Sequence, residues 1–387
     1  MTFLKKTNFI LGIYIAVAMI ASMAEVLKGV KVFDGQPYTR YNNFLIFKYA
    51  FSNLISGKDL YQLYPDLFFD YFKYSPTFAA LMAPFAILPN VPGYFAWNLL
   101  NALAVFFAIK TFPADHDDKR AFMLYFVLLA LLTNLQNAQS NGIMAALIIF
   151  SFNFFEKRRV FWAALCIMLS FYLKIFGVAA AVLFLLYPDK LKFIAAALFW
   201  GILLGILPLL IISPDQLLTQ YQSWLHLLQS DQSVSYGISV MGILHSWLGV
   251  APDKMLVQAI GLMLLLLPLP RVSQFTERTF RQFFLASLLI WVVIFNHKAE
   301  SPTFIIAMCG AAIWYFMQPR RPVHLALLIF AFVLTALSPT DIFPRFVRKM
   351  WVLPFKLKAL PCILIWARLT YQLLTERFNG LTPARDR

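Results

Sequence analysis

Long apolar runs separated by short polar breaks make up most of this sequence. Several runs have roughly the 17 to 25 residues that a helix needs to cross the hydrocarbon core of a membrane. Backbone groups in lipid must find partners within their own segment, and the even alternation typical of a membrane β-barrel is absent. The pattern therefore predicts an all-α, polytopic membrane protein with about ten transmembrane helices. We expect residues 1–387 to form one membrane-embedded domain.

One long polar segment, from Gly29 to Ser75, interrupts this pattern after the first apolar run. It is the only long segment rich in carboxylates, and it also contains many tyrosines. Within it, residues 41–55 place apolar side chains at three- and four-residue spacing, which is typical of a helix lying flat on a membrane surface. We predict that this first loop carries surface helices and contains the functional site.

Basic clusters beside the apolar runs indicate which helix ends face the cytoplasm. They occupy residues 156–159, 190–192, 271–281 and 320–321. Lys5 and Lys6, followed by the apolar residues 8–24, also fit a signal sequence, but the run continues to Val26, which favours a retained first helix. This orientation makes the first loop extracytoplasmic, in a protein of the cytoplasmic (inner) membrane. Further turns then face outward, at residues 134–141, around 174, and at 213–235, 296–302 and 338–350.

The apolar piece 77–89 is too short for an ordinary crossing and is bounded by Pro76 and Pro89. Counting it as a crossing would place the charged residues 115–120 outside and upset every later assignment. We therefore predict a re-entrant or broken helix there, since proline interrupts the hydrogen bonding of a helix interior.

Composition excludes several classes of function. Hydrophobic residues make up 61% of the chain and charged residues 13%, against about 25% charged residues in a soluble domain. The net charge of +15 comes from clusters at the edges of apolar runs, so membrane lipids rather than nucleic acid are the expected partner. The three cysteines lack a CxxC spacing, and no histidine pair has metal-ligand spacing. We expect no metal and no cofactor.

Three motifs follow one another in a characteristic order. They are 56-SGKDLYQLYPDLFFDYFKYSPTFAALMAPFAILP-89, 135-LQNAQSNGIMAAL-147 and 172-YLKIFGV-178. Together they resemble the Gly-x-x-Leu-Tyr, Tyr-x-Pro, Gly-Gln-x-Asn and Leu-Lys-Pro elements of glycosyltransferase family 87, in the C-type glycosyltransferase superfamily. The resemblance covers roughly residues 1–300, and the order of the motifs is its stronger part.

The resemblance implies a multi-pass transferase that moves a sugar from a polyprenyl phosphate to a glycan or lipid acceptor of the cell envelope. It also implies that an acidic residue of the first outer loop takes the proton of the acceptor hydroxyl, while cations stabilise the departing phosphate. Where the family usually has this aspartate, the sequence has Asn43, and an amide cannot take a proton. Either Asp34, Asp59 or Glu300 supplies the base, or the activity is lost or altered.

Each of these carboxylates also has an ordinary structural interpretation. Asp34 precedes Gly35 in a stretch that suits a turn. Asp59 follows Gly57 and suits a helix cap. Glu300 belongs to 296-NHKAES-301, which fits a solvated loop as well as a site for leaving-group binding and proton transfer.

Donor and substrate binding is expected from polar residues near these carboxylates. Lys174 separates two apolar pieces, where a cation is costly unless it reaches water or an anion. The amide-rich turn around Gln139 and Asn141 suits sugar or phosphate contacts, although a solvated turn is the alternative. The complete predicted binding set is Asn43, Lys48, Tyr74, Gln139, Asn141, Lys174, His297 and Lys298.

A second basic segment lies near the C-terminus, between residues 345 and 358. On the predicted orientation it lies outside and attracts a polyprenyl phosphate or an anionic acceptor; with one crossing more or fewer it is a cytoplasmic anchor. Two other functions stay open. A transporter or flippase predicts internal repeats and ionisable groups inside the spans, whereas an inert scaffold tolerates loss of every acid in the first loop.

Overall fold

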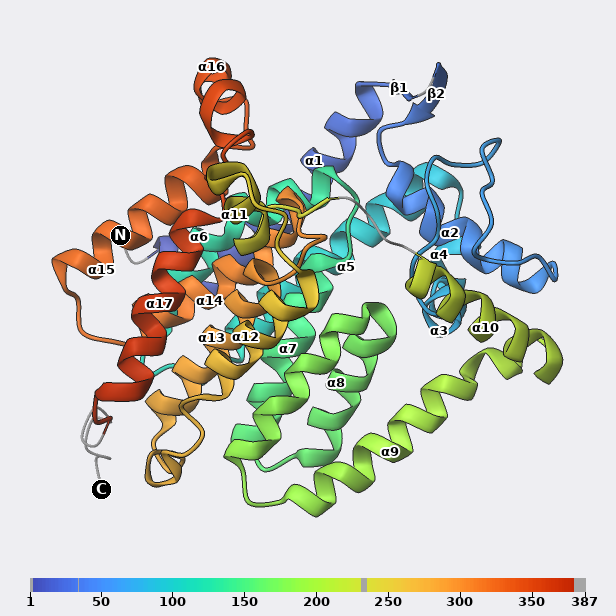
Figure 1. The fold of residues 1–387 in the computed structure, drawn as a ribbon. Helices are drawn as coiled ribbons and strands as arrows, with labels where there is room; N and C mark the ends of the chain where they lie inside the picture. Colours follow the sequence, from blue (N-terminus) through green and yellow to red (C-terminus); the bar gives the residue numbers. More distant parts are fainter. Residues whose placement is uncertain (1–2, 34, 231–234, 379–387) are drawn as a thin grey trace.

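The computed structural model describes residues 3–33, 35–230 and 235–378, and helices dominate it (Figure 1). The first half contains η1 (Phe3–Lys5), α1 (Thr7–Leu27), β1 (Val30–Phe33), β2 (Gln36–Thr39), α2 (Asn42–Ile55), α3 (Pro76–Leu81), α4 (Ala83–Ala86), α5 (Asn90–Lys110), α6 (Asp117–Gln136), α7 (Asn141–Glu156), α8 (Val160–Leu173) and the 3-10 helix η2 (Ile175–Leu186). The second half contains α9 (Lys190–Ile206), η3 (Leu207–Leu210), α10 (Pro214–Ser230), α11 (Val240–Leu248), α12 (Lys254–Leu266), η4 (Val272–Gln274), α13 (Arg278–Ile294), η5 (Ser301–Thr303), α14 (Phe304–Phe316), α15 (Pro322–Ala331), η6 (Phe332–Leu337), α16 (Arg345–Val347), η7 (Arg348–Val352) and α17 (Leu360–Thr375). The predicted all-α class is confirmed.

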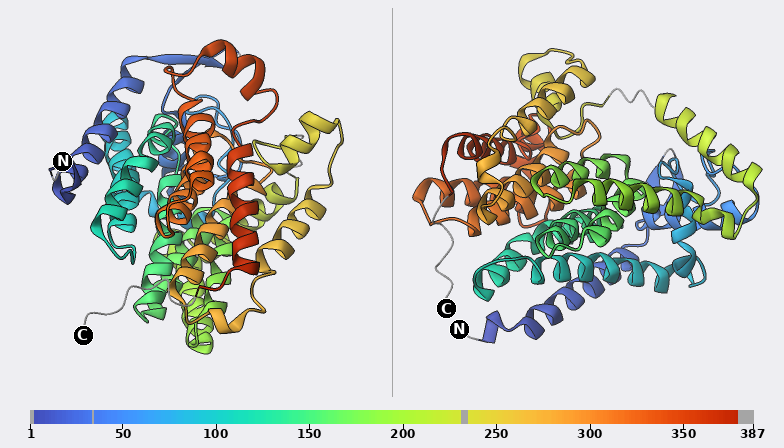
Figure 2. Two further views of the ribbon diagram at one scale, coloured as in Figure 1. Left: turned by 90° about the vertical axis from the view of Figure 1, so that its left-hand side faces the viewer. Right: turned by 90° about the horizontal axis from the view of Figure 1, so that it is seen from below.

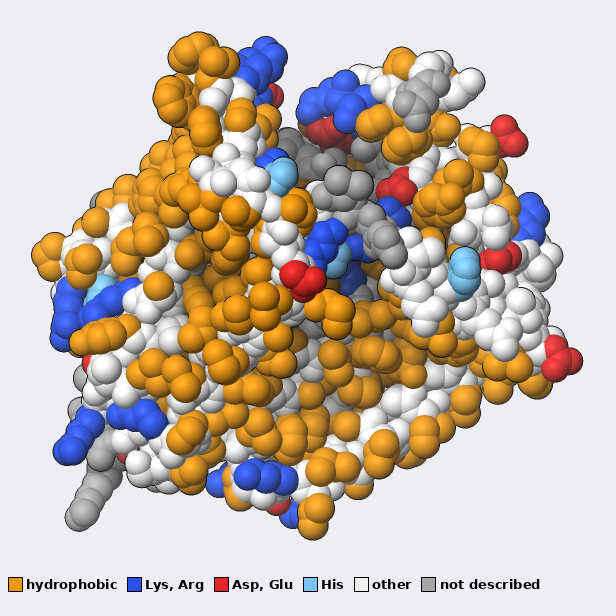
Figure 3. Space-filling view, in the orientation of Figure 1, with side chains coloured by type: hydrophobic (Ala, Val, Ile, Leu, Met, Phe, Trp, Pro, Cys, Tyr) orange, Lys and Arg blue, Asp and Glu red, His pale blue; other side chains and the backbone are white. Residues whose placement is uncertain are grey.

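Three helical segments in the described part of the chain are long and apolar enough to cross a membrane. They are α1, α5 and the segment Lys190–Leu210, which joins α9 to η3. The other apolar helices have 10 to 17 residues, because turns and prolines divide the apolar runs. The predicted number of about ten crossings is therefore not confirmed. Exposed apolar side chains such as Leu198 and Ile202 on α9 suit contact with lipid (Figure 3).

The first loop opens with a small hairpin in which β1 and β2 pair antiparallel, Val30 opposite Thr39. The segment predicted as a surface helix then forms α2, with an apolar face that includes Phe44, Phe47 and Leu54 and is fully buried. Hairpin and α2 project together from one end of the helical bundle (Figure 1).

The prediction of a broken helix at 77–89 is confirmed. The segment forms two short helices, α3 and α4, of 6 and 4 residues, and α5 then runs back along the bundle. The charged residues that follow α5 consequently lie beside the N-terminal segment, where Lys5 pairs with Asp118 and Tyr125 Oη donates to Leu4 O at 2.7 Å.

The bundle has two chemically different ends. One, called here the basic end, holds the clusters at 156–159, 190–192, 271–281 and 320–321, and the first and last described helices, η1 and α17, reach toward it (Figure 2). The Glu156 side chain, which is 6% exposed, connects three segments of this end. Its carboxylate accepts from Arg281 Nε at 2.6 Å and from Tyr187 Oη at 2.7 Å. The opposite end, called the loop end, holds the hairpin, α2, α10 and the turns at 137–140 and 296–300.

Candidate functional site

Lys174 is the centre of a polar cluster at the loop end. It lies in the turn between α8 and η2, outside both apolar helices, and its side chain is half-buried. Its Nζ donates to Asn141 Oδ1 at 2.8 Å and lies 5.7 Å from the centroid of the Tyr74 ring. Three segments that are far apart in the sequence therefore meet at one ammonium group.

The electrostatics of this cluster favour an anionic ligand. Burial lowers the pKa of Lys174 to about 8, and the Glu300 carboxylate opposes this shift. Within the described residues Lys174 has no carboxylate at salt-bridge distance. An ammonium has three donor positions, and Asn141 occupies one, so the others are available to an anion.

Tyr74 supplies a neutral hydroxyl beside this cation. Burial raises the pKa of Tyr74 well above its usual range, and the negative charge of Glu300 adds to the shift. The phenol therefore stays protonated and can donate a hydrogen bond. The Tyr74 carbonyl accepts from Tyr61 Oη at 2.9 Å, which connects this residue to the first loop.

Asn43 lies at the start of α2, against the turn between α6 and α7. Its Nδ2 donates to Asn137 O at 2.9 Å. In the same turn the carbonyl of half-buried Gln139 accepts from Asn134 Nδ2 at 3.2 Å. The position at which the resemblance placed a catalytic aspartate is thus occupied by an amide that supports the turn leading into Asn141.

Lys48 is engaged elsewhere in the fold. Its side chain is buried, and Nζ donates to Leu88 O at 2.6 Å and to Asn90 Oδ1 at 2.7 Å. These contacts connect α2 to the start of α5. They also supply the hydrogen-bond acceptors that a buried ammonium group requires. Burial also lowers the pKa of Lys48. The structure therefore separates Lys48 from the Lys174 cluster.

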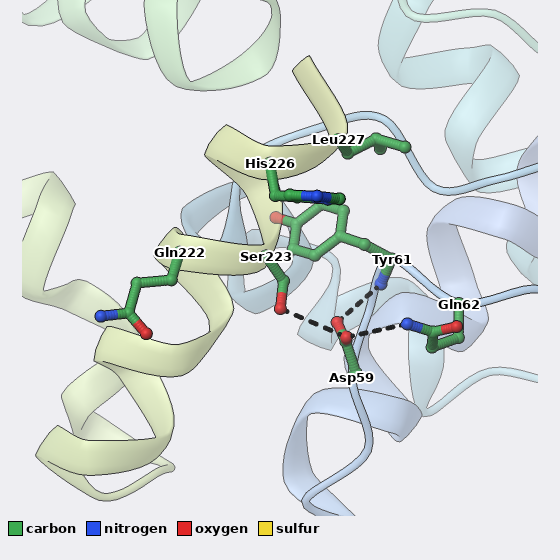
Figure 4. A pocket seen from close by; sticks show the side chains of 7 residues that line it. All are labelled: Asp59, Tyr61, Gln62, Gln222, Ser223, His226 and Leu227. Carbon is green, nitrogen blue, oxygen red and sulfur yellow. Dashed lines mark hydrogen bonds between the residues drawn. The ribbon is translucent and has the colours of Figure 1, made fainter. Parts of the chain in front are cut away.

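Asp59 lines a separate pocket of about 300 Å³ between the first loop and α10 (Figure 4). Its carboxylate accepts from Tyr61 N at 3.0 Å, from Gln62 Nε2 at 3.2 Å and from Ser223 Oγ at 3.2 Å. His226 lines the same pocket. The helix-cap interpretation of Asp59 is wrong, because no helix of the described structure begins between Ile55 and Pro76; its carboxylate instead accepts hydrogen bonds within a turn and lies in one pocket with an imidazole.

The contribution of α10 to this pocket was missed at the level of sequence. Ser223 and His226 are three residues apart and so share one helix face. The neighbouring Gln220 completes a polar stripe, because its side chain bonds the backbone of the first loop at Lys58 and Leu60. The sequence signal available was the three- and four-residue spacing of the polar residues 216, 220 and 223, which places them on one helix face.

The turn at 296–301 holds three predicted residues in different surroundings. The Nδ1 atom of His297 lies 3.5 Å from Gln258 Nε2 on α12. Lys298 is exposed, and its backbone N–H donates to Asn296 Oδ1 at 2.9 Å. Glu300 is also exposed and precedes η5. Of these three side chains, Glu300 is the one that acts electrostatically on both Tyr74 and Lys174.

The remaining predicted acid, Asp34, lies outside the described residues. Among the residues that are described, no group of three or more His, Cys, Asp or Glu side chains is arranged to hold a metal ion. The loop end thus presents a cation, a neutral phenol, amides and two carboxylates, which is chemistry suited to holding an anion and moving a proton.

Comparison with known protein families gives a match over most of the chain. The sequence model of glycosyltransferase family 87 matches residues 72–339. This range includes Tyr74, Asn141, Lys174 and Glu300, and it begins after Asn43 and Asp59. No curated protein matches the chain.

Proposed function

The chain belongs to glycosyltransferase family 87, and from this premise we propose that it transfers a sugar from a polyprenyl phosphate to a glycan or lipid acceptor. We place the reaction at the extracytoplasmic face of the cytoplasmic membrane, in one membrane-embedded domain. The separation of the basic end from the loop end supports this orientation, since basic clusters usually remain in the cytoplasm.

The observation that carries the proposal is the environment of Lys174. In the transfer, the bond from the anomeric carbon to the phosphate oxygen breaks while a bond to the acceptor oxygen forms. Negative charge then grows on the departing polyprenyl phosphate, and a pre-positioned cation stabilises it. Lys174 has donor positions available for this purpose, and Asn141 fixes the direction of its ammonium. The neutral Tyr74 hydroxyl can donate to the same phosphate or to the sugar.

The acceptor hydroxyl must also lose its proton, and Glu300 is our leading candidate for the base. Its negative charge raises the pKa of both Lys174 and Tyr74, and its carboxylate accepts from the backbone N–H of Thr303 at the start of η5. Asp59 is the second candidate, because it lines a pocket beside His226, although its carboxylate already accepts three hydrogen bonds. Asp34 is retained as the third candidate from its place in the sequence.

A transfer assay with the purified full-length protein tests this function. The donors are a panel of polyprenyl-phosphate sugars, and the acceptors are extracted from membranes. We expect turnover with at least one donor. If the folded protein transfers no sugar from any donor but moves a labelled donor across proteoliposomes, it is a transporter or flippase and the proposed function is wrong.

Carboxylate variants then identify the base. Glu300→Gln keeps the size of the side chain, and we expect it to lower kcat by about 10²- to 10⁴-fold while donor binding persists. Asp59→Asn and Asp34→Asn are compared in parallel, and Asp66→Asn, at an exposed carboxylate of the first loop, is the matched control. Near wild-type turnover in the first three variants would refute the assignment of the base.

A further inference from the structure

A second basic site lies at the loop end, in a small cavity between residue 301 and the segment 338–358. Its volume is about 100 Å³, close to that of three water molecules. The polar residues lining it are Ser301, Ser338, Arg348, Lys356 and Lys358. No Asp or Glu is among the described residues that line it.

Lys358 is the most deeply buried of these cations, with 3% of its surface exposed. Its Nζ donates to Ser301 O at 3.1 Å and lies 5.2 Å from the centroid of the Phe304 ring. Within the described residues no carboxylate pairs with it. A buried ammonium without a counter-ion costs several kcal/mol. Lys358 therefore destabilises the folded state unless an anion binds beside it.

Arg348 is held in place rather than neutralised. Its Nη1 donates to Pro339 O at 3.0 Å and to Thr340 O at 3.2 Å. These bonds to carbonyl groups orient the guanidinium, and they leave its other N–H groups for a further acceptor. As with Lys358, no described carboxylate pairs with Arg348.

Lys356 adds a third cation and a strained backbone. Its φ of +53° lies in the left-handed region, which costs a residue with a Cβ roughly 1 to 2 kcal/mol. The side chain is half-buried, and no ion pair of Lys356 occurs in the part of the chain that the structure describes. Strained backbone conformations of this kind cluster at ligand-binding and active sites.

From this convergence we propose that the cavity is a binding site for a phosphate group, held by Lys358, Lys356 and Arg348. Three cations without carboxylate partners suit a group with up to two negative charges better than a singly charged carboxylate. The cavity has room for the tetrahedral head of such a ligand, while a whole sugar ring must stay outside it.

The electrostatics of the cavity agree with this geometry. Burial lowers the pKa of Lys358, which lies in the turn before α17, to about 7. Without an anion, the fold therefore keeps part of the population uncharged near neutral pH. A bound phosphate dianion reverses this effect, because an opposite charge nearby favours the ammonium form.

The cavity is a different site from the Lys174 cluster proposed for glycosyl transfer, and its lining residues differ from those of that cluster. It lies mostly in residues 340–358, which follow the range matched by the family, 72–339. Exposed apolar side chains stand beside it on α16 and η7, among them Phe346, Met350 and Trp351. The projecting tip around α16 is apolar on one side and basic on the other (Figure 3). This surface suits a phosphate carried by a lipid.

Binding measurements on the full-length protein in detergent test the proposal with two probes, inorganic phosphate and dodecyl phosphate. We expect saturable binding of at least one probe and an increase in Tm on binding. Tight binding of dodecyl phosphate alone identifies a lipid phosphate as the ligand, and equal affinities identify free phosphate. If neither probe binds, the proposal is wrong.

Variants assign the binding to this cavity. Lys358→Met should weaken binding about 10- to 100-fold, the effect of losing one charge-assisted hydrogen bond. Lys356→Ala, at a half-buried position, provides a second test if the first variant does not fold. Lys349→Ala, on an exposed neighbour outside the cavity, is the control and should bind normally. Equal weakening in all three variants, or none in the first two, would overturn the assignment.

Discussion

Replacing Lys174 by methionine separates binding from folding, because the two effects have opposite signs. The variant keeps the length of the side chain but removes the charge that we assign to the donor phosphate. We expect donor affinity to fall about 10- to 100-fold, while the protein without ligand keeps or gains stability.

The change in stability follows from the pKa of Lys174, which burial lowers from 10.5 to about 8. At 1.36 kcal/mol per unit, charged Lys174 costs the folded state at most about 3 kcal/mol, and residual solvent screening reduces this figure. The variant avoids that cost but leaves buried Asn141 Oδ1 without its partner, which costs about 1 to 3 kcal/mol. At the upper limit of the charge cost, the net change is a gain of about 0 to 2 kcal/mol, and screening makes the gain smaller.

The same pKa predicts how stability depends on pH. Between about pH 8 and 10.5 the unfolded chain holds the Lys174 proton that the folded protein has already released. Stability rises with pH wherever the unfolded state binds more protons. The wild type should therefore gain stability relative to the methionine variant across this window, and both proteins should change in parallel below it.

The assays are thermal unfolding in detergent at several pH values and titration with a polyprenyl-phosphate sugar. Lys58→Met, at an exposed lysine of the first loop, is the control and should leave both quantities unchanged. If Lys174→Met binds donor like the wild type, the ammonium does not hold the phosphate. If the variant loses several kcal/mol of stability, Lys174 serves the fold and the reasoning from burial fails.

Three further changes test other parts of the structure. In a variant without native cysteines, single cysteines at Asp59 and Glu300 should react with an impermeant thiol reagent in intact cells; labelling only after permeabilisation would contradict the orientation. Gly177→Ala should cost about 1 to 3 kcal/mol or more, because the new Cβ would lie 2.4 Å from a backbone carbonyl of α8, and an unchanged Tm would contradict this packing. Glu156→Gln should cost about 3 to 5 kcal/mol by leaving its buried arginine partner without a counter-charge; a shift in Tm no larger than that of an exposed control would refute this role.

Hydrophobic periodicity and proline positions were enough to predict the all-α class, but residues 213–235, expected as a turn, contain helix α10. The break at 77–89 could be predicted because two prolines bound a piece too short to cross, and the structure divides it into α3 and α4. The number of crossings was less predictable, because η2, η6 and similar segments are too short to be recognised by length alone.

The grouping of the site residues depended on contacts that sequence patterns do not contain. Asn141 and Lys174 were singled out from separate motifs, and only the fold shows that their side chains are hydrogen-bonded. Lys48 looked equally suitable, but carbonyl and amide partners about 40 residues away hold its ammonium. His226 belongs to no histidine pair with metal-ligand spacing, yet α10 places it in one pocket with Asp59. Long-range partners of this kind are set by packing.

Adjacent residues of one turn belong to the two proposed phosphate sites. The negative charge of Glu300 raises the pKa of Lys174, and the carbonyl of Ser301 accepts a hydrogen bond from Lys358. The same turn is held by a further hydrogen bond, in which Ile238 N donates to Ala299 O at 2.8 Å. A ligand that shifts this turn therefore acts on both sites. Thermodynamic linkage makes any such effect reciprocal: the factor by which phosphate in the cavity changes donor affinity must equal the factor by which donor changes phosphate affinity.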